Sequence, residues 1–373
     1  MTQRYCSLPQ QPAPSFAPGL AAERLSALVG GRRIWVNGTV LHYHFFDAET
    51  DGSVIPVPGT GETRWVPWAG AKEQCDVVRE CFREWQDLGI GVTFAEVADR
   101  REAELRIGFQ CGDGSWSQVG RDALAVGLNE RTMNLGWDLT RPGQRVTALH
   151  EIGHALGMQH EHQSPLAGIH WDDEAVYADL AGPPNFWNRD RTFFNILREL
   201  DPSEVNGSVW DPQSVMEFPF EAGLVLEPEQ YHGGLHPPGT LSPADKEFVL
   251  RWYPPAGPPS ASNRPDQGDP HRPATLVPFR SAPLGLGPGG QADFAVEPPE
   301  SRDYSVGTFG DADSVVVVFE ERDGEPRYLA GRDDGGTPHN AVLRVRLVKG
   351  RRYFVRVRLY SAWGTGETAV MCW

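Results

Sequence analysis

The spacing of hydrophobic residues changes along the chain, and it predicts the order of the elements. In residues 71–89 (AKEQCDVVRECFREWQDLG) apolar positions recur at helical intervals, which is typical of an amphipathic helix ending at Gly89. A second, buried helix is expected over residues 147–156. Short strands are expected at 91–97, 103–110 and 131–138, and a β-hairpin over 32–46 that turns at Asn37-Gly38. This order predicts an α+β domain in which a twisted sheet packs on two helices.

The later part of the chain has a different pattern. It is irregular until residues 241–254, where Ser242 suits a helix N-cap, Pro243 the first helical position and Asp245 the first turn. Residues 254–273 are rich in proline and indicate a linker. Evenly spaced alternating segments follow, such as NAVLRVRL and RRYFVRVRLY, and they predict a β-sandwich. We therefore divide the chain into an N-terminal arm (1–30), an α+β domain (31–254), a Pro-rich linker (255–282) and an all-β sandwich domain (283–373).

Composition narrows the choice of partners. The chain has 373 residues and a formal net charge of −16, which argues against nucleic acid and against an anionic membrane surface as partners. No apolar run approaches the ~20 residues of a membrane-spanning helix. The N-terminal residues lack the apolar core of a secretory signal peptide. We expect a soluble protein that acts as a monomer.

The five cysteines are expected to be mostly free thiols. Their number is odd, so at least one is unpaired. Cys75 and Cys81 lie in one predicted helix and point to different faces, so they are poorly placed to bond to each other.

The stretch HEIGHALGMQHEH, residues 150–162, carries the chemistry. On a helix His150 and His154 share one face, about 6 Å apart along the axis. His160 joins them only if the helix stops, and Gly157 is the residue that can end it in a left-handed conformation. Three converging imidazoles form a site for one Zn²⁺ with a position left open, which is the mark of a catalytic zinc. Glu151 is placed to take a proton from the zinc-bound water as it attacks a carbonyl.

The same stretch resembles the astacin family of metzincin zinc peptidases. The extended motif H-E-x-x-H-x-x-G-x-x-H is present, and Glu161 and His162 follow the third histidine as in that family. Met216 in DPQSVMEFP matches the methionine turn beneath the metal, and SWSQVGR (115–121) resembles a family segment. The resemblance covers residues 31–254 and implies a metzincin α+β fold, one zinc ion, and hydrolysis of protein or peptide substrates by a metalloendopeptidase. It also implies secretion, whereas the chain shows no classical signal peptide, so a mature form, another export route and action inside the cell all stay open.

The chain departs from the family pattern at three places. Ser115 replaces a cysteine, so the usual disulfide pair is not expected. Glu217 and Phe218 follow the turn methionine where the family has a tyrosine that stabilises the transition state, and Phe218 has no hydroxyl to donate. QSP replaces the run that often follows the zinc motif. An alternative is therefore a catalytically weakened metzincin-fold protein that binds through its sandwich, although the general base Glu151 favours an enzyme.

Three expectations concern the periphery of the site. In metzincins the edge strand of the sheet pairs with substrate, and residues 132–136 or 124–128 are the candidates here. Cys6 in the arm could occupy the open zinc position and hold the enzyme latent, but a solvent-exposed thiol in a Pro-rich tail is favoured. The sandwich resembles pre-peptidase C-terminal modules. Its GRDDGG stretch offers Asp333 and Asp334 to Ca²⁺, although a glycine-rich hairpin turn is favoured.

Overall fold

The computed structural model describes the greater part of the chain in two compact units. The described residues are 5–10, 33–35, 39–56, 62–201, 210–255, 273–287, 290–310, 312–332, 340–360 and 366–373. The first unit takes in the chain up to Trp35 together with Leu41–Leu88 and Phe94–Phe248. The second takes in Val36–Val40, Gly89–Thr93 and Val249–Trp373. No helix among the described residues has the length and apolar character needed to cross a bilayer.

A five-stranded sheet forms one half of the first unit, in the order β4-β1-β5-β7-β6. Its strands are β1 (Val40–Phe45), β4 (Thr93–Glu96), β5 (Leu105–Gly108), β6 (Ser115–Ser117) and β7 (Met133–Leu135). Strands β1, β5 and β7 are parallel, and β6 runs antiparallel to β7 at the edge. The predicted edge segments are therefore wrong. Residues 133–135 are fully buried and lie inside the sheet, and Gly120–Ala125 form a 3₁₀ helix, η2.

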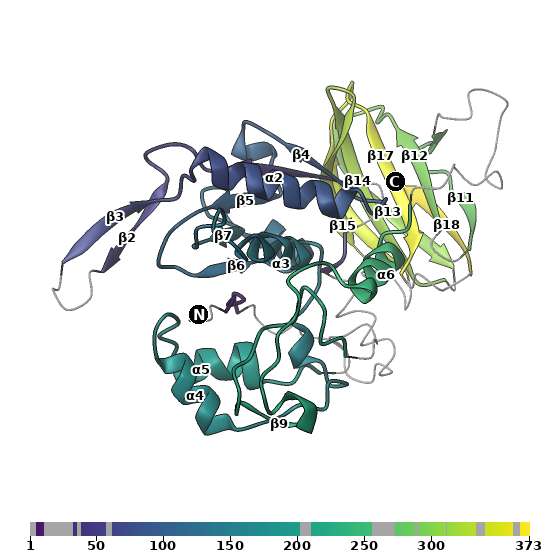
Figure 1. Ribbon diagram of the computed structural model, residues 1–373. Coiled ribbons are helices and arrows are strands. Elements are labelled where there is room, and N and C mark those ends of the chain that lie inside the picture. The colour runs from purple at the N-terminus through teal and green to yellow at the C-terminus, as the bar shows by residue number, and fades with distance from the viewer. Residues whose placement is uncertain are drawn as a thin grey trace. The chain divides into compact units, whose positions relative to one another are not determined.

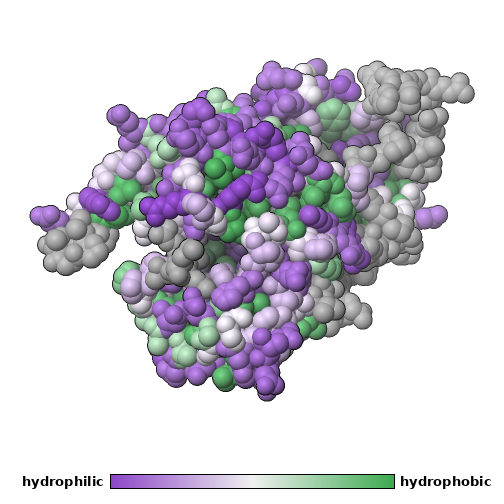
Figure 2. All heavy atoms as spheres, viewed as in Figure 1, coloured by the Kyte–Doolittle hydropathy of each residue, from purple (hydrophilic) through white to green (hydrophobic). Residues whose placement is uncertain are grey.

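Two helices pack together on this sheet, as the hydrophobic periodicity predicts. Helix α2 (Lys72–Gln86) buries its apolar face, and the Trp85 indole donates to the carbonyl oxygen of Leu149 in α3 (Arg145–Ala155) at 3.2 Å. Figure 2 shows hydrophilic residues over most of the outward side of α2.

The predicted hairpin over 32–46 is wrong in the described residues. Residues 33–35 form no strand, and β1 pairs with β5 instead. Trp35 is fully buried, and its indole donates to the carbonyl oxygen of Ala155 at the end of α3 at 2.7 Å. This tertiary contact outweighs the local alternation. The Asn37-Gly38 pair lies outside the described residues.

The other half of the first unit follows the zinc motif and contains more helix than the sequence pattern predicts (Figure 1). Its elements are η3 (Glu161–Gln163), β8 (His170–Trp171), α4 (Asp173–Ala181), α5 (Arg189–Thr192), the π-helix η4 (Phe193–Leu197), β9 (Val225–Glu227), η6 (Glu229–Tyr231) and α6 (Pro243–Trp252). Side chains cap the two unexpected helices: Asp172 accepts from Ala175 N at 3.1 Å, and Asn188 accepts from Arg191 N at 2.8 Å. Helix α6 begins at Pro243, as predicted.

Three smaller elements complete the first unit. Strands β2 (Gly52–Pro56) and β3 (Thr63–Pro67) form an antiparallel hairpin, and η1 (Arg100–Glu102) is a single 3₁₀ turn.

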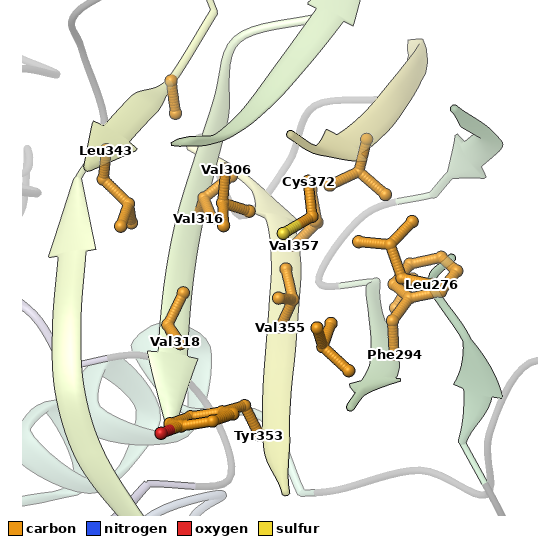
Figure 3. Packing of buried hydrophobic residues seen from close by; sticks show 14 of the residues in the cluster. Leu276, Phe294, Val306, Val316, Val318, Leu343, Tyr353, Val355, Val357 and Cys372 are labelled. Carbon is orange, nitrogen blue, oxygen red and sulfur yellow. The ribbon is translucent and has the colours of Figure 1, made fainter. Parts of the chain in front are cut away.

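The second unit contains the predicted all-β sandwich. One sheet has the order β10-β12-β17-β14-β15 and the other β11-β18-β13-β16. The strands are β10 (Ala274–Thr275), β11 (Ala282–Leu286), β12 (Gln291–Val296), β13 (Arg302–Gly310), β14 (Ser314–Arg322), β15 (Glu325–Arg332), β16 (Val342–Leu347), β17 (Tyr353–Leu359) and β18 (Gly366–Cys372). Figure 3 shows their inward side chains packed between the sheets, with Val355 and Val357 of the alternating strand β17 both fully buried. Asp333 and Asp334 lie outside the described residues.

Candidate metal centre

The three predicted histidines converge on one point. Helix α3 places the rings of His150 and His154 on one face, with 4.6 Å between their centroids. The helix then ends, and Gly157 has a φ of 99°, a left-handed conformation that favours glycine. The turn brings His160 back, so that its ring centroid lies 5.4 Å from that of His150 and 4.8 Å from that of His154.

Hydrogen bonds on the outer ring nitrogens leave the inner ones available. Nδ1 of His150 lies 2.8 Å from the carbonyl oxygen of Val215, and Nδ1 of His154 lies 2.8 Å from that of Met158. Nδ1 of His160 lies 3.2 Å from Oε1 of Gln163. Because oxygen accepts, each Nδ1 carries the proton and each Nε2 keeps its lone pair. All three Nε2 atoms are buried and have no hydrogen-bond partner among the described residues. Three buried, converging lone pairs fit a Zn²⁺ ion.

Burial also keeps these imidazoles neutral, as metal ligation requires. Loss of solvent lowers the pKa of His150 to about 4, and it holds the pKa values of His154 and His160 well below their ordinary range.

The methionine turn supports the helix from below. A Cβ atom built on Gly153 would lie 2.4 Å from Sδ of Met216, so the turn fits against α3 only because residue 153 has no side chain. Asp245 holds the turn in place by accepting from the Ser214 hydroxyl at 2.6 Å and from Val215 N at 2.8 Å. The carbonyl oxygen of the same Val215 orients His150. The sequence pattern places Asp245 at the start of a helix but does not reveal this connection to the metal centre.

Glu151 faces the same space as the histidines. It is fully buried, and its Oε2 accepts a hydrogen bond from Sγ of Cys6 at 3.4 Å. Its Oε1 has no partner among the described residues. Burial raises the pKa of Glu151 above its ordinary range, and the bond from Cys6 opposes that rise.

Cys6 completes the cluster. Its Sγ and one nitrogen from each of His150, His154 and His160 all lie within 4.8 Å of one another. The side chain is 3% exposed, so the favoured prediction of a solvent-exposed thiol is wrong. All five cysteines are free, which confirms the prediction of free thiols and the loss of the disulfide pair at Ser115.

The arm residues 5–10 lie between the sheet half and the α4–α5 half of the first unit (Figure 1). Ser7 N donates to the carbonyl oxygen of Ser115 in the edge strand β6 at 3.2 Å. On the other side, Leu8 N donates to Oδ1 of Asn195 at 2.8 Å and Tyr5 N donates to Oδ1 of Asn185 at 3.3 Å. These contacts explain why the arm is ordered here. The two asparagines belong to no motif that the sequence shows.

Phe218 lies against the histidines, at the position where the family resemblance places a tyrosine. Its ring is 4% exposed and stacks on His150 with 5.3 Å between centroids and 21° between planes. Glu217 is also buried, and its Oε2 accepts from the Trp210 indole at 2.7 Å. Two donor-bearing side chains later in the chain have contacts of their own: Tyr231 packs on Trp210, and a ring nitrogen of His232 lies 2.5 Å from the carbonyl oxygen of Leu226.

Comparisons with known proteins agree with this geometry. The family model for astacin, a family of peptidases, matches residues 68–167. A solved structure of myroilysin is 31% identical, covers 61% of this chain and 98% of its own, and superposes with a TM-score of 0.50. The chain belongs to the astacin family.

Weaker structural likenesses exist over other parts of the chain. The hatching enzyme zinc-protease HCE-1 of Oryzias latipes is 14% identical over 59% of this chain and 94% of its own, with a TM-score of 0.38. The pre-peptidase C-terminal domain of a Bacillus anthracis collagenase is 14% identical over 29% of this chain and all of its own, with a TM-score of 0.24. No curated protein matched the chain in a sequence search.

Membership of this family establishes the general class of the protein. It is an astacin-family metallopeptidase with a metzincin-like α+β domain and a strand-rich C-terminal region. The family depends on zinc, and its substrates are proteins or peptides.

Proposed function

We propose that the chain is a zinc metalloendopeptidase whose metal is held by Nε2 of His150, His154 and His160. The observation that carries this proposal is the set of three buried Nε2 atoms without partners among the described residues, each fixed by a bond to Nδ1 on the opposite side of its ring. Zinc bound there would supply Lewis-acid chemistry, making a water molecule more acidic and polarising the scissile carbonyl.

Glu151 acts as the general base. Its carboxylate takes one proton from the attacking water while the oxygen forms a bond to the carbonyl carbon. The same proton is delivered to the amine nitrogen as the C–N bond breaks, and the carboxylic acid formed passes its remaining proton to the amine, so the products are one carboxylate and one ammonium group. Two observations support this role: Oε1 of Glu151 has no partner among the described residues, and its Oε2 accepts from Cys6, whose sulfur lies among the histidine nitrogens.

Cys6 keeps the enzyme latent. Its Sγ lies among the three ligand nitrogens and donates a hydrogen bond to Glu151, so it covers both the metal position and the general base. Substrate reaches neither until the arm leaves. Cys6→Ala should therefore raise basal peptide hydrolysis at unchanged zinc content, and Cys111→Ala, which alters an exposed cysteine, should not. Equal rates in both variants and the parent would remove Cys6 from control of activity.

The function is tested on the full chain carrying Cys6→Ala. We expect one zinc per chain by elemental analysis, hydrolysis of a mixed peptide library, and loss of both zinc and hydrolysis in a further His154→Ala variant. A chain that binds zinc at these histidines but cleaves no peptide would instead support the alternative, a binding protein. Phe218 in place of the family tyrosine is the observation that favours that alternative.

We also propose that the protein is secreted, acts as a monomer and has no nucleic-acid or membrane partner.

A further inference from the structure

Tyr5, the neighbour of Cys6, fills a closed aromatic pocket. Its ring is 2% exposed. Between ring centroids it lies 5.2 Å from Phe218, with 73° between the ring planes, and 5.7 Å from Phe220, with 29° between the planes. The centroid of the Trp187 ring is 6.3 Å away. Aliphatic residues complete the same buried cluster: Val176, Leu180, Ile196, Leu224 and Leu235. A pocket of this kind buries an aromatic side chain completely.

The pocket adjoins the metal centre. Phe218 forms part of its wall and also stacks on His150, so one ring joins the two sites. Tyr5 and Cys6 are consecutive, so only one peptide unit separates the residue in the pocket from the residue at the metal position. A substrate held at that position therefore presents a residue beside its scissile bond to the pocket.

Two carboxylates act on the Tyr5 phenol, and one cation, Arg191, lies over the Trp187 ring at the pocket wall, 5.2 Å from its centroid. Burial raises the pKa of Tyr5 above its ordinary range, and the carboxylates of Asp179 in α4 and of Glu221, both exposed, raise it further. Burial and Glu221 likewise raise the pKa of Asp179. A carboxylate side chain entering the pocket would lose water and meet two like charges. A neutral ring would suffer neither cost.

We propose that the Tyr5 pocket is the subsite that selects substrate, and that it accepts an aromatic residue flanking the scissile bond and rejects aspartate and glutamate. The arm occupies the subsite in the latent enzyme as a substrate side chain does in the active one. Asn185, which accepts from Tyr5 N, receives the corresponding substrate N–H. This inference rests on the proposed peptidase function.

Cleavage-site profiling tests the selection. The full chain with Cys6→Ala is given peptides that differ only at the two residues flanking one bond. We expect kcat/KM to be about 100-fold higher with phenylalanine or tyrosine than with alanine at one flanking position, the range expected for filling an apolar pocket. Enrichment of lysine, arginine or acidic residues there, or no preference, would overturn the proposal. Absence of all cleavage would instead count against the peptidase function.

Charge variants test the rejection of acids. Because Asp179 and Glu221 are exposed, Asp179→Asn with Glu221→Gln should leave the fold intact. We expect cleavage beside glutamate to rise about fivefold, the scale of exposed charge interactions, with cleavage beside phenylalanine unchanged. Glu174→Gln, on the same helix and also exposed, is the matched control and should change neither rate. An equal rise in the control, or no rise in the double variant, contradicts the proposed role of these charges.

A thiol-labelling experiment tests the pocket without catalysis. In a Cys111→Ser background, Cys6 reacts with a disulfide reagent only when the arm lifts. Tyr5→Phe should label at the parent rate, and Tyr5→Asp should label at least about tenfold faster because the pocket rejects the carboxylate. Equal rates for the two variants would overturn the pocket's selectivity. This result stands whether or not the chain cleaves peptides, so the two proposals can fail separately.

Discussion

Glu151 is the residue on which the proposed chemistry depends most directly. Replacing it by glutamine keeps the shape of the side chain but removes the ability to take a proton from water. Glu151→Gln in the Cys6→Ala background should therefore keep its zinc and lose about 10²–10⁴-fold in turnover. Zinc analysis and peptide hydrolysis measure the two effects, with Glu73→Gln on the exposed side of α2 as control. Turnover near that of the parent would mean that another group is the base.

Phe218 is the second residue with a sharp expectation. A tyrosine hydroxyl at this position could donate to the developing oxyanion, an interaction that is worth about 2.7–4 kcal/mol when well placed. Phe218→Tyr should therefore raise kcat by up to about 10²–10³-fold, the rate equivalent of that free energy. KM should stay nearly unchanged, because the hydrogen bond forms only in the transition state.

Single-turnover rates at equal zinc content measure this effect. Phe193→Tyr is the control, because this ring is exposed and belongs to neither the metal centre nor the cluster around Tyr5. A Phe218→Tyr protein no faster than the parent would show that the donor comes from elsewhere or that the enzyme works without it.

At this scale the sequence predicts local geometry well and distant partners poorly. The convergence of His150, His154 and His160 follows from helical spacing and one glycine, all within one short stretch of chain. The burial of Cys6 depends on contacts with residues far along the chain, such as Asn195, which is 187 positions from Leu8. No local pattern contains that information, and the composition of the arm favoured disorder.

Among the elements, α3 carries a test of how closely the methionine turn fits. Helix propensity alone predicts that Gly153→Ala stabilises the protein by about 1 kcal/mol. The contact with Met216 predicts the opposite sign, because the new Cβ would lie 2.4 Å from Sδ. We expect a loss of about 1–3 kcal/mol in the free energy of unfolding, as for other overpacked cores.

Denaturant unfolding of the zinc-loaded protein measures that loss. The shorter side chain in Met216→Val should recover part of it when combined with Gly153→Ala, which a double-mutant cycle detects. A stabilised Gly153→Ala protein would show that the turn yields to the methyl group.

The errors in predicting elements have a common cause. Residues 132–136 are one of the two candidate edge segments, yet Met133–Leu135 is fully buried between β5 and β6, and Ser115–Ser117 forms that edge. Strand order within a sheet depends on long-range pairing that hydrophobic alternation does not encode. In contrast, α2, α3 and the start of α6 carry their own signals in spacing, caps and proline, and these predictions are confirmed.

For the whole molecule, the change of pattern after the Pro-rich linker predicts the change from α+β to all-β structure. It does not predict that the second compact unit also takes in Val36–Val40 and Gly89–Thr93, which are distant in sequence. Which unit these two segments join depends on long-range contacts that form only as the chain folds. The boundary at residues 254–255 therefore remains a proposal that truncation can test.

Deleting residues 260–373 should leave a folded chain that binds zinc and, with Cys6→Ala, cleaves short peptides. The described residues of the metal centre all lie before residue 249. The cut also keeps Tyr253, which is fully buried and whose carbonyl oxygen accepts from Gly91 N at 2.9 Å. A shorter chain ending at Phe248 loses this contact and the end of α6, and it should be less stable by about 3–5 kcal/mol from the lost aromatic side chain alone. Zinc content, thermal unfolding and peptide hydrolysis of the two truncated proteins compare them directly. If the longer one is insoluble or free of metal, the sandwich is part of the catalytic fold rather than a separate domain.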